Sequence, residues 1–492
     1  MKLHCIFDRA NIKYPFHLKD IEVGGITSRS NEVKENYIFV CLKGTKNDGH
    51  DYIAEAFSKG AVACVIENPK YECDRTVTVD CTRSALANLL NVFNGEPTKK
   101  LKFIGVTGTN GKTSVTVMIK NILDECHLSC ELIGTLNCSS FSENSQCSHT
   151  HFTTPDPEEL YPMLRRMSDA GVELVVMEAS SHALKLKKLD PIKFDVGIFT
   201  NLTEDHLDFH LTMEDYFKSK LMLFEKCVLG IINIDDEFGK RIAEIAPCKI
   251  KTCSTIKNAD YFAKDVLKLE NGTKYVIAND GTELEIYLKI LGSYSIMNSM
   301  QACACARELN IDDETIKKSF DNFKGVKGRL EKIDFFKDRD FSVFIDYAHT
   351  PDALLKALDT LKSIKNEKGR LVLLFGCGGD REKQKRRIMG EIAVNNADFV
   401  IITSDNPRSE SPMEIINDIL VGVGDKTNFT VIPDRRKAIE YAIANALARD
   451  VILLAGKGHE NYEINAHGAF HFDEREVLSD IIKLQGGMNY ED

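Results

Sequence analysis

A glycine-rich stretch between an apolar run and an amphipathic run constrains the fold of this chain more than any other feature. The stretch GVTGTNGKTS spans residues 105–114, continues the apolar run KFIGV and leads into TSVTVMIKNIL. That order is typical of a strand, a tight loop and a helix. Gly108 and Gly111 let the backbone approach an anion, and the first N–H groups of the helix add positive potential. The sequence therefore predicts a phosphate-binding loop inside an α/β domain.

The loop differs from the common phosphate-binding signature G-x-x-x-x-G-K-[ST], which would require a glycine at Val106. Gly105 lies one residue earlier, and Gly108 is additional. Lys112 can still reach the β- and γ-phosphates, and the Thr113 hydroxyl can ligate Mg²⁺. The alternative is a glycine-rich turn with an exposed lysine. We predict a nucleotide site whose loop contacts come from Gly108, Thr109, Asn110, Gly111, Lys112, Thr113 and Ser114.

Strand-like runs alternate with amphipathic stretches along the chain, which indicates βαβ units and mostly parallel sheets. The polar stretch NGEPTKK (94–100) precedes a new strand, and the pattern breaks again near residues 324–334. A hairpin with an Asp-Gly turn is expected within residues 275–290. We predict three α/β domains: residues 1–98, a central P-loop-type sheet with helices over 99–333, and a Rossmann-like domain over 334–492.

Composition excludes several classes of protein. A net charge of −11 over 492 residues argues against a general nucleic-acid binder. The longest apolar runs fall far short of the roughly 20 residues that a membrane helix needs. The N-terminus lacks the apolar core of a signal peptide, and the 15 cysteines include no C-x-x-C. We therefore expect reduced thiols in a cytoplasmic protein without a membrane partner.

Polar residues follow each of four apolar runs in the C-terminal third. Ligands of open α/β sheets bind beyond the carboxyl ends of the strands. This region is therefore expected to form part of an active site. The residues after the four runs are Asp346 and His349; Gly378, Gly379 and Asp380; Asp405, Asn406 and Arg408; and Lys457, His459 and Glu460.

Two further stretches carry candidate metal ligands. Glu178 closes the apolar run ELVVM, and His206 lies in TNLTEDHLDFH (200–210), where Asp205 and Asp208 are weaker candidates. A carboxylate at the end of a strand beside the phosphate loop would face Mg²⁺. Read singly, each of these residues is a capping or surface residue, and only their place beside the loop favours metal binding.

These residues resemble the Mur ligases of bacterial cell-wall synthesis. The similarity runs from TSRSNEVKENYIFV in the N-terminal third to GKGHE at residues 456–460, and is closest to the members that add the third residue of the peptide. It implies an N-terminal UDP-substrate domain. It also implies activation of a carboxylate by ATP and Mg²⁺ to an acyl phosphate, which an amine then attacks. The motifs that carry it are GVTGTNGKTS, MEASSHAL, TNLTEDHLDFH, GRLE, DYAHTPDAL, GCGGDR, SDNPR and GKGHE.

The resemblance also implies substrates and roles. The substrates would be ATP, UDP-N-acetylmuramoyl-L-alanyl-D-glutamate and meso-2,6-diaminopimelate, acted on by a monomer. Lys112, Glu178, His206 and Lys220 would be catalytic. Lys220 would become carbamylated and hold Mg²⁺ together with Thr113, Glu178 and His206. Further nucleotide contacts would come from Asn298, Arg329 and Asp346; contacts to the UDP-substrate would come from Ser28, with the region 43–50, and from Thr153, Thr154, Ser180 and Lys188.

The motif DNPR (405–408) resembles that of the family members that accept meso-2,6-diaminopimelate, and the resemblance therefore implies this amino acid. Diaminopimelate has a second carboxylate, which a guanidinium binds through two parallel hydrogen bonds. Lysine would leave the Arg408 guanidinium unpaired. The resemblance assigns amino-acid contacts to Arg386, Asp405, Asn406, Pro407, Arg408, Gly456 and Glu460. The alternatives are the same ligase acting on L-lysine or another diamino acid, a more distant ligase like folylpolyglutamate synthetase, or a non-catalytic scaffold.

Four positions depart from the family pattern. Lys188 stands where an arginine is usual, and Leu186 where a glutamine is usual. Ser295 replaces an asparagine, and Thr27 replaces an aspartate. Lys188 keeps the positive charge but loses the planar fork of arginine. The expected contacts to the muramoyl peptide are affected most.

Overall fold

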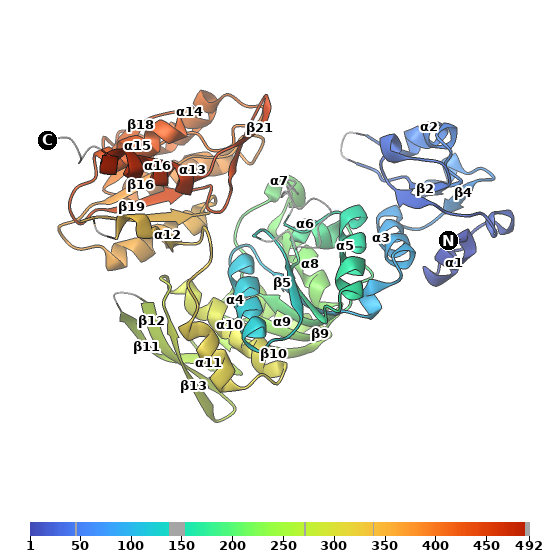
Figure 1. Cartoon of the computed structure of the whole chain (residues 1–492), viewed down its shortest axis with the longest axis horizontal. Helices are drawn as coiled ribbons and strands as arrows, with labels where there is room; N and C mark the ends of the chain where they lie inside the picture. The colour runs from blue at the N-terminus through green and yellow to red at the C-terminus, as the bar shows by residue number, and fades with distance from the viewer. Residues whose placement is uncertain (45–46, 137–152, 270–271, 338, 488–492) are drawn as a thin grey trace.

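The chain folds into three large β-sheets with helices, arranged in a row with the central sheet in the middle, and a small two-stranded sheet (Figure 1). The structure is a computed structural model that describes residues 1–492 except 45–46, 137–152, 270–271, 338 and 488–492. Within these described ranges, none of the helices is both long and apolar enough to cross a membrane. The expected α/β class is confirmed, because mostly parallel strands alternate with helices.

The N-terminal sheet has four parallel strands in sequence order, because each strand returns through a helix or loop to the next. The apolar runs YIFV and ACVI form its second and third strands. Helix α3 packs against α5 of the central part, so the two hydrophobic cores are continuous. The elements are α1 (Leu3–Arg9), β1 (Gly25–Thr27), β2 (Tyr37–Val40), α2 (Ile53–Ser58), β3 (Ala63–Ile66), β4 (Thr76–Thr78) and α3 (Thr82–Phe93).

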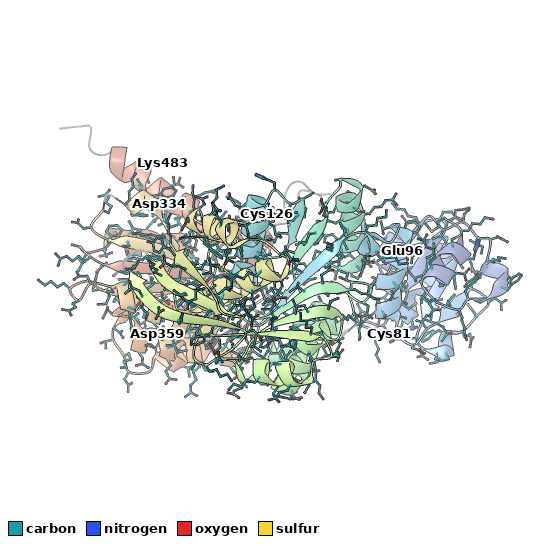
Figure 2. The ribbon with its side chains drawn as sticks, turned by 90° about the horizontal axis from the view of Figure 1, so that it is seen from below. Cys81, Glu96, Cys126, Asp334, Asp359 and Lys483 are labelled. Carbon is teal, nitrogen blue, oxygen red and sulfur yellow. The ribbon has the colours of Figure 1, made fainter. Side chains whose placement is uncertain are left out.

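Glu96 stabilises the segment that joins the first two sheets, and Figure 2 labels this residue at the junction. Its backbone is left-handed, with φ of 55°. Its side chain is 7% exposed and pairs with Arg9 from α1 and with Lys99, the latter at 2.5 Å. An ion pair from each side therefore holds the turn before Pro97.

The central sheet has nine strands in the order β13-β12-β11-β10-β9-β8-β5-β7-β6. Strands β5, β7 and β8 are buried on both faces, which explains their near-continuous apolar sequences. The strands are β5 (Lys102–Thr107), β6 (Cys130–Ile133), β7 (Leu174–Glu178), β8 (Phe194–Phe199), β9 (Cys227–Asn233), β10 (Lys249–Ser254), β11 (Tyr261–Leu269), β12 (Gly272–Asn279) and β13 (Thr282–Leu288).

Helices cover the central sheet. Helix α4 follows the phosphate loop and packs against α10 and α11. The expected hairpin is confirmed as β12–β13, where Asn279 pairs with Thr282 around the Asp-Gly turn. The helices are α4 (Lys112–Glu125), α5 (Pro157–Asp169), α6 (Ser181–Lys185), α7 (Leu207–His210), α8 (Met213–Phe224), α9 (Glu237–Ile245), α10 (Tyr294–Glu308) and α11 (Asp313–Asp321).

The C-terminal sheet has six strands in the order β14-β15-β19-β16-β17-β18, all parallel except β14. Helices lie on both faces, as expected of a Rossmann-like sheet. The elements are β14 (Glu331–Lys332), β15 (Ser342–Asp346), α12 (Pro351–Ile364), β16 (Leu371–Phe375), α13 (Gln384–Asn396), β17 (Phe399–Ile402), α14 (Pro412–Val423), β18 (Phe429–Val431), α15 (Arg435–Ala444), β19 (Val451–Ala455), β20 (Tyr462–Asn465), β21 (Gly468–His471) and α16 (Glu474–Gly487).

The domain boundaries expected after residues 98 and 333 stay predictions. Strand β14 already pairs with β15, so pairing within the C-terminal sheet begins at Glu331. Strands β20 and β21 form a separate two-stranded hairpin beyond β19.

Leu211, between α7 and α8, has a strained backbone that generates a stability prediction. Its φ is 61° and its ψ −35°, and its side chain is 80% exposed. This backbone conformation costs free energy for a bulky residue such as leucine, and the exposed side chain gains no burial that would offset the cost. We expect Leu211→Gly to raise the midpoint of urea-induced unfolding by an amount equivalent to about 1 kcal/mol.

Leu128 provides the control for Leu211→Gly, because it is also partly exposed, at 39%, but its backbone lies outside the left-handed region. Leu128→Gly should lower the same midpoint, since it loses burial and gains freedom in the unfolded chain. A lower midpoint for Leu211→Gly would contradict the assignment of strain.

Candidate active site

One cavity of about 430 Å³ lies where the carboxyl ends of the central and C-terminal strands face each other. It brings together most of the residues that the sequence singled out. The cavity wall contains Gly108, Thr109, Asn110, Gly111, Lys112, Thr113, Ser114, Thr153, Thr154, Glu178, Ser180, Lys188, His206, Lys220, Asn298, Arg329, Asp346, Asp405, Asn406, Arg408, Gly456 and Glu460. Ser28, Arg386 and Pro407 lie outside this wall.

The loop between β5 and α4 requires glycine at two positions. Gly108 has φ of 150°, and a Cβ there would lie 1.8 Å from Thr200 Oγ1. Gly111 has φ of 87°, and a Cβ there would lie 2.7 Å from Asn298 Oδ1. Only glycine combines this backbone with such close neighbours. The interior glycine that the common signature lacks is therefore part of the loop's geometry.

Two lysines converge on one carbonyl of the loop. Lys112 Nζ donates to Gly108 O at 2.9 Å, and Lys220 Nζ from α8 donates to the same oxygen at 2.7 Å. Burial lowers the pKa of Lys112, although Glu178 opposes the shift. Burial and then Lys112 lower the pKa of Lys220 well below its usual range. Deprotonation of Lys220 relieves the repulsion between the two side chains.

Glu178, at the end of β7, lies directly beside the loop. Its Oε1 accepts the Thr113 hydroxyl at 3.0 Å and the Thr135 N–H at 2.8 Å. Arg329 donates to the Thr113 hydroxyl at 3.1 Å. A hydroxyl and a carboxylate in contact match the few protein ligands that Mg²⁺ takes beside phosphate oxygens. Among the described residues, no group of three or more His, Cys, Asp or Glu side chains is placed to hold a metal ion by itself.

His206 reaches the cavity from a left-handed position, with φ of 56°, just before α7. Its Nε2 lies 3.4 Å from Asp205 Oδ2. The ring of His182 lies between the rings of His206 and Phe209, at centroid distances of 4.9 and 4.1 Å. Burial lowers the pKa of His182 to about 4, so its ring is neutral near neutral pH. His206 is thus held by a carboxylate and by aromatic packing.

Arg329 and Asp346 lie where the chain passes from the central to the C-terminal sheet. Asp346 accepts the N–H groups of Leu330 at 2.6 Å and of Ala348 at 2.7 Å. Arg329 lies over the Tyr347 ring, with its guanidinium carbon 4.6 Å from the ring centroid. Burial raises the pKa of Asp346. These contacts fix the connection between the two sheets against the cavity.

On the C-terminal side of the cavity, Arg408 lies near the carboxylates of Asp405 and Glu460, and Arg381 and Lys385 also line this side. Arg408 Nη1 donates to Gly379 O at 2.8 Å. No carboxylate of the described residues lies within ion-pair distance of Arg408. Asn406 Nδ2 donates to Glu460 Oε2 at 2.8 Å. Burial and then the Asp405 carboxylate raise the pKa of Glu460. This side can therefore bind a carboxylate and an ammonium on one ligand.

Arg386 does not reach the cavity, in contrast to Arg408. Its side chain is fully buried, and its two terminal nitrogens bind Glu410 at 2.8 Å and Asp418 at 2.9 Å. It also donates to Gly378 O at 3.1 Å. Arg386 therefore holds the turn after β16, and its expected contact with an amino acid stays a prediction.

Two of the residues expected to bind the UDP-substrate, Ser28 and Lys188, contact carboxylates at the start of α5. The Ser28 N–H and hydroxyl both donate to Glu158 Oε1, at 3.2 and 2.5 Å. Lys188 Nζ lies 2.6 Å from Asp156 Oδ1. Thr154 donates to the Glu178 carbonyl at 2.8 Å. These positions are therefore able to bind acidic groups. The region 43–50 falls partly outside the described residues.

Sequence reasoning missed several residues of the cavity wall. Tyr347 lies between two residues that were singled out in DYAHT, and Lys385 lies in a charge run that looks solvated. Asp352 binds the loop, since Asn110 Nδ2 donates to its Oδ2 at 2.9 Å. The sequence around a helical residue such as Asp352 does not indicate such a contact, because the contact depends on how two domains pack together.

Family models match three successive parts of the chain. The model described as "Mur ligase family, catalytic domain" matches residues 22–94, "Mur ligase middle domain" matches residues 106–306, and "Mur ligase, glutamate ligase domain" matches residues 328–458. The matched ranges contain the phosphate loop and most of the C-terminal turns.

Known proteins match over nearly the whole chain. The UDP-N-acetylmuramoyl-L-alanyl-D-glutamate–2,6-diaminopimelate ligase of Caldanaerobacter subterraneus subsp. tengcongensis is 42% identical over 468 residues, which cover 94% of this chain and 95% of that protein. A solved structure of a ligase with the same name has a TM-score of 0.66 at 30% identity, covering 94% and 95% of the two chains.

A folylpolyglutamate synthase of Mycobacterium tuberculosis shares the fold alone. Its TM-score is 0.63 at 18% identity, over 76% of this chain and 92% of that one. The expected resemblance is confirmed by the family models and by the near full-length match: this chain belongs to the Mur ligase family.

Proposed function

We propose that this Mur ligase joins meso-2,6-diaminopimelate to UDP-N-acetylmuramoyl-L-alanyl-D-glutamate, with ATP as co-substrate, in peptidoglycan precursor synthesis. One observation carries the proposal. The phosphate loop with Lys112, and Lys220 from α8, lie in one wall of a cavity, and Arg408 with the Asp405 and Glu460 carboxylates lies in the facing wall. The relative at 42% identity bears the name of this reaction.

The phosphate loop would bind the phosphates of ATP. The N–H groups at the start of α4 and the Lys112 ammonium provide positive charge where the transferred phosphoryl group becomes more negative. Asn298, Arg329 and Asp346 would bind the remainder of the nucleotide. The acid of the dipeptide would then become an acyl phosphate. The chain's part in this step is positioning and neutralisation of charge.

The residues beside the loop fit Mg²⁺. Thr113, Glu178 and His206 would hold it, together with Lys220 as a carbamate, and the cation would neutralise negative charge on the phosphates. Glu178 already receives the Thr113 hydroxyl, so one hydrogen bond would be exchanged for ligation.

Lys220 is suited to carbamylation. Only a neutral amine attacks CO₂, and burial favours the neutral form of this side chain. The side chain is 1% exposed and lies over the Tyr216 ring at 4.4 Å. The carbamate would place a negative charge beside the Lys112 ammonium. Lys112 would then gain an ionic partner.

Arg408 would bind the distal carboxylate of diaminopimelate, and Glu460 with Asp405 would bind the distal ammonium. Asn406 and Gly456 would line this end of the cavity, and Pro407, outside its wall, would act through the turn that it shares with Arg408. Arg386 would act indirectly, because its guanidinium holds Gly378 O rather than facing the cavity. Lysine lacks the second carboxylate and would leave Arg408 unpaired at a cost of about 1–3 kcal/mol.

The UDP-substrate would extend from the N-terminal sheet to the central wall. Ser28 would bind its diphosphate end, and Thr153, Thr154, Ser180 and Lys188 would bind the muramoyl peptide. Ser28 and Lys188 would exchange the carboxylates of α5 for acidic groups of the substrate. The contact between Asn110 and Asp352 brings the C-terminal part against the loop, and this closure would exclude water from the acyl phosphate. A cytoplasmic monomer remains our expectation.

Phosphate release tests the proposed function directly. We expect release from ATP only when UDP-N-acetylmuramoyl-L-alanyl-D-glutamate and meso-diaminopimelate are both present. Other diaminopimelate isomers, L-lysine, L-ornithine and L-glutamate should support much slower release. A lysine rate equal to the diaminopimelate rate would favour the other diamino-acid ligase. Release with folate and glutamate would favour the folylpolyglutamate-type reaction, and no release with any acceptor would contradict a ligase.

Arg408 and Arg386 form a matched pair of arginines. Arg408→Met should raise the KM for diaminopimelate by roughly 10-fold to 100-fold, with little change in the KM for ATP or in the thermal midpoint. Arg386→Met should lower the thermal midpoint by the equivalent of about 3 kcal/mol in unfolding free energy, because it removes the buried guanidinium that pairs with Glu410 and Asp418. If Arg386→Met instead raised the KM for diaminopimelate and Arg408→Met lowered the thermal midpoint, Arg386 would be the residue that binds the amino acid.

Lys220→Ala should reduce turnover by about a hundredfold, because a ligand of the metal is lost. Short carboxylic acids added to the assay should restore part of that turnover. Lys218, which is exposed on the same helix, provides the control, and Lys218→Ala should leave turnover unchanged. Full turnover of Lys220→Ala would exclude the carbamate.

A further inference from the structure

Lys457 is a buried lysine in the C-terminal part, and the proposed reaction leaves it without a role. It follows β19 in GKGHE, and its side chain is fully buried. It does not line the cavity, whereas its neighbours Gly456 and Glu460 do. An ammonium at such a position is costly unless it is paired and hydrogen-bonded.

Two of the contacts of Lys457 lead to the wall that would bind the amino acid. Its Nζ donates to Asn406 Oδ1 at 3.1 Å and to the Tyr462 carbonyl at 2.8 Å. Asp405 Oδ1 lies 3.6 Å from the same nitrogen. Asn406 in turn donates from Nδ2 to Glu460 Oε2 at 2.8 Å. Lys457 thus touches one wall carboxylate directly and the other through the Asn406 amide.

The amide of Asn406 can make these contacts in only one orientation. Its Oδ1 accepts from Lys457 and also from the Ile464 N–H at 3.0 Å. Two donors on the oxygen leave the nitrogen to face Glu460. The Lys457 ammonium therefore determines that the Asn406 nitrogen, and not its oxygen, faces the Glu460 carboxylate.

Asp405 and Glu460 are two acidic groups in one buried wall. Asp405 is 6% exposed, and its Oδ1 has no hydrogen-bond partner. Two neighbouring carboxylates without a cation favour protonation of one of them. The charged and titratable groups that face Glu460 are Asp405, Lys457, Arg408, Tyr347 and Tyr462. Lys457 and Arg408 supply the positive charge of this set.

We propose that Lys457 is a positioning residue for the amino-acid substrate: its buried ammonium orients the Asn406 amide, which holds Glu460 toward the cavity, and its positive charge favours the carboxylate form of Glu460 that would receive the substrate's distal ammonium. This inference rests on the proposed function. In this assignment the lysine of GKGHE acts on Asn406 and on the two carboxylates of the cavity wall, and it does not contact the substrate.

Removal of the charge should make binding of the amino acid depend on pH. In Lys457→Met the pKa of Glu460 should rise further, because Lys457 is one of the groups that lowers it. Glu460 would be protonated at neutral pH and lose its attraction for an ammonium. The ratio of variant KM to wild-type KM for diaminopimelate should be roughly fivefold to tenfold at about pH 7. It should fall as pH rises, because Glu460 ionises again.

The ratio is the quantity to measure, because ionisation of the substrate itself cancels between the two enzymes. Lys457→Gln should show the same trend, and it provides a second neutral variant if Lys457→Met folds poorly. The KM for ATP should change less than twofold in both variants. Lys457→Arg, which keeps the charge, should give a ratio that does not change with pH.

Arg370 supplies the stability control. It pairs with the buried Asp450 at the opposite, amino-terminal edge of the same sheet, at 2.6 Å. Arg370→Met should lower the thermal midpoint without a pH-dependent change in the KM for diaminopimelate. A ratio near one for Lys457→Met and Lys457→Gln, or a ratio constant with pH, would overturn the proposal. Absence of turnover in the wild-type protein would instead refute the proposed function.

Discussion

The parallel pairing of β5 with β7 and β8 is the constraint on which the site depends. The register places Val106 opposite Glu178 on one side and Ile198 on the other. Because all three strands run in the same direction, their carboxyl ends meet at one edge. The phosphate loop, the Glu178 carboxylate and the segment with His206 therefore emerge together, although they are separated by long stretches of sequence.

The C-terminal sheet repeats this arrangement and faces the first. Strand β19 lies between β15 and β16, so the turns with Asp346, Gly378 and Gly456 leave the sheet side by side. The connection through Arg329 and Asp346 ties the two edges together. A reaction between a phosphorylated acid and an amine needs two polar edges separated by a closed cavity, and the two parallel sheets supply them.

Charges in this cavity are set by burial and by partners. Burial, and then the neighbouring charge of Lys112, favour a neutral Lys220, although both side chains donate to the same carbonyl. Arg386 and Arg408 lie in the same domain, yet Arg386 is neutralised by two carboxylates while Arg408 meets backbone carbonyls. An arginine without a carboxylate partner beside a cavity is suited to bind one from a ligand. Local sequence does not distinguish these two side chains.

The sequence by itself determined the α/β class, the predicted strands that carry the phosphate loop and the C-terminal turns, the β12–β13 hairpin and the family. Glycine spacing, apolar runs and turn residues determine local structure, so that structure can be predicted from residues that are adjacent in the sequence. Only the tertiary structure decided that Arg386 is buried between acids and that Lys457 stands behind Asp405. Such contacts join residues from different strands, and their energies depend on burial and on distances that no local pattern contains.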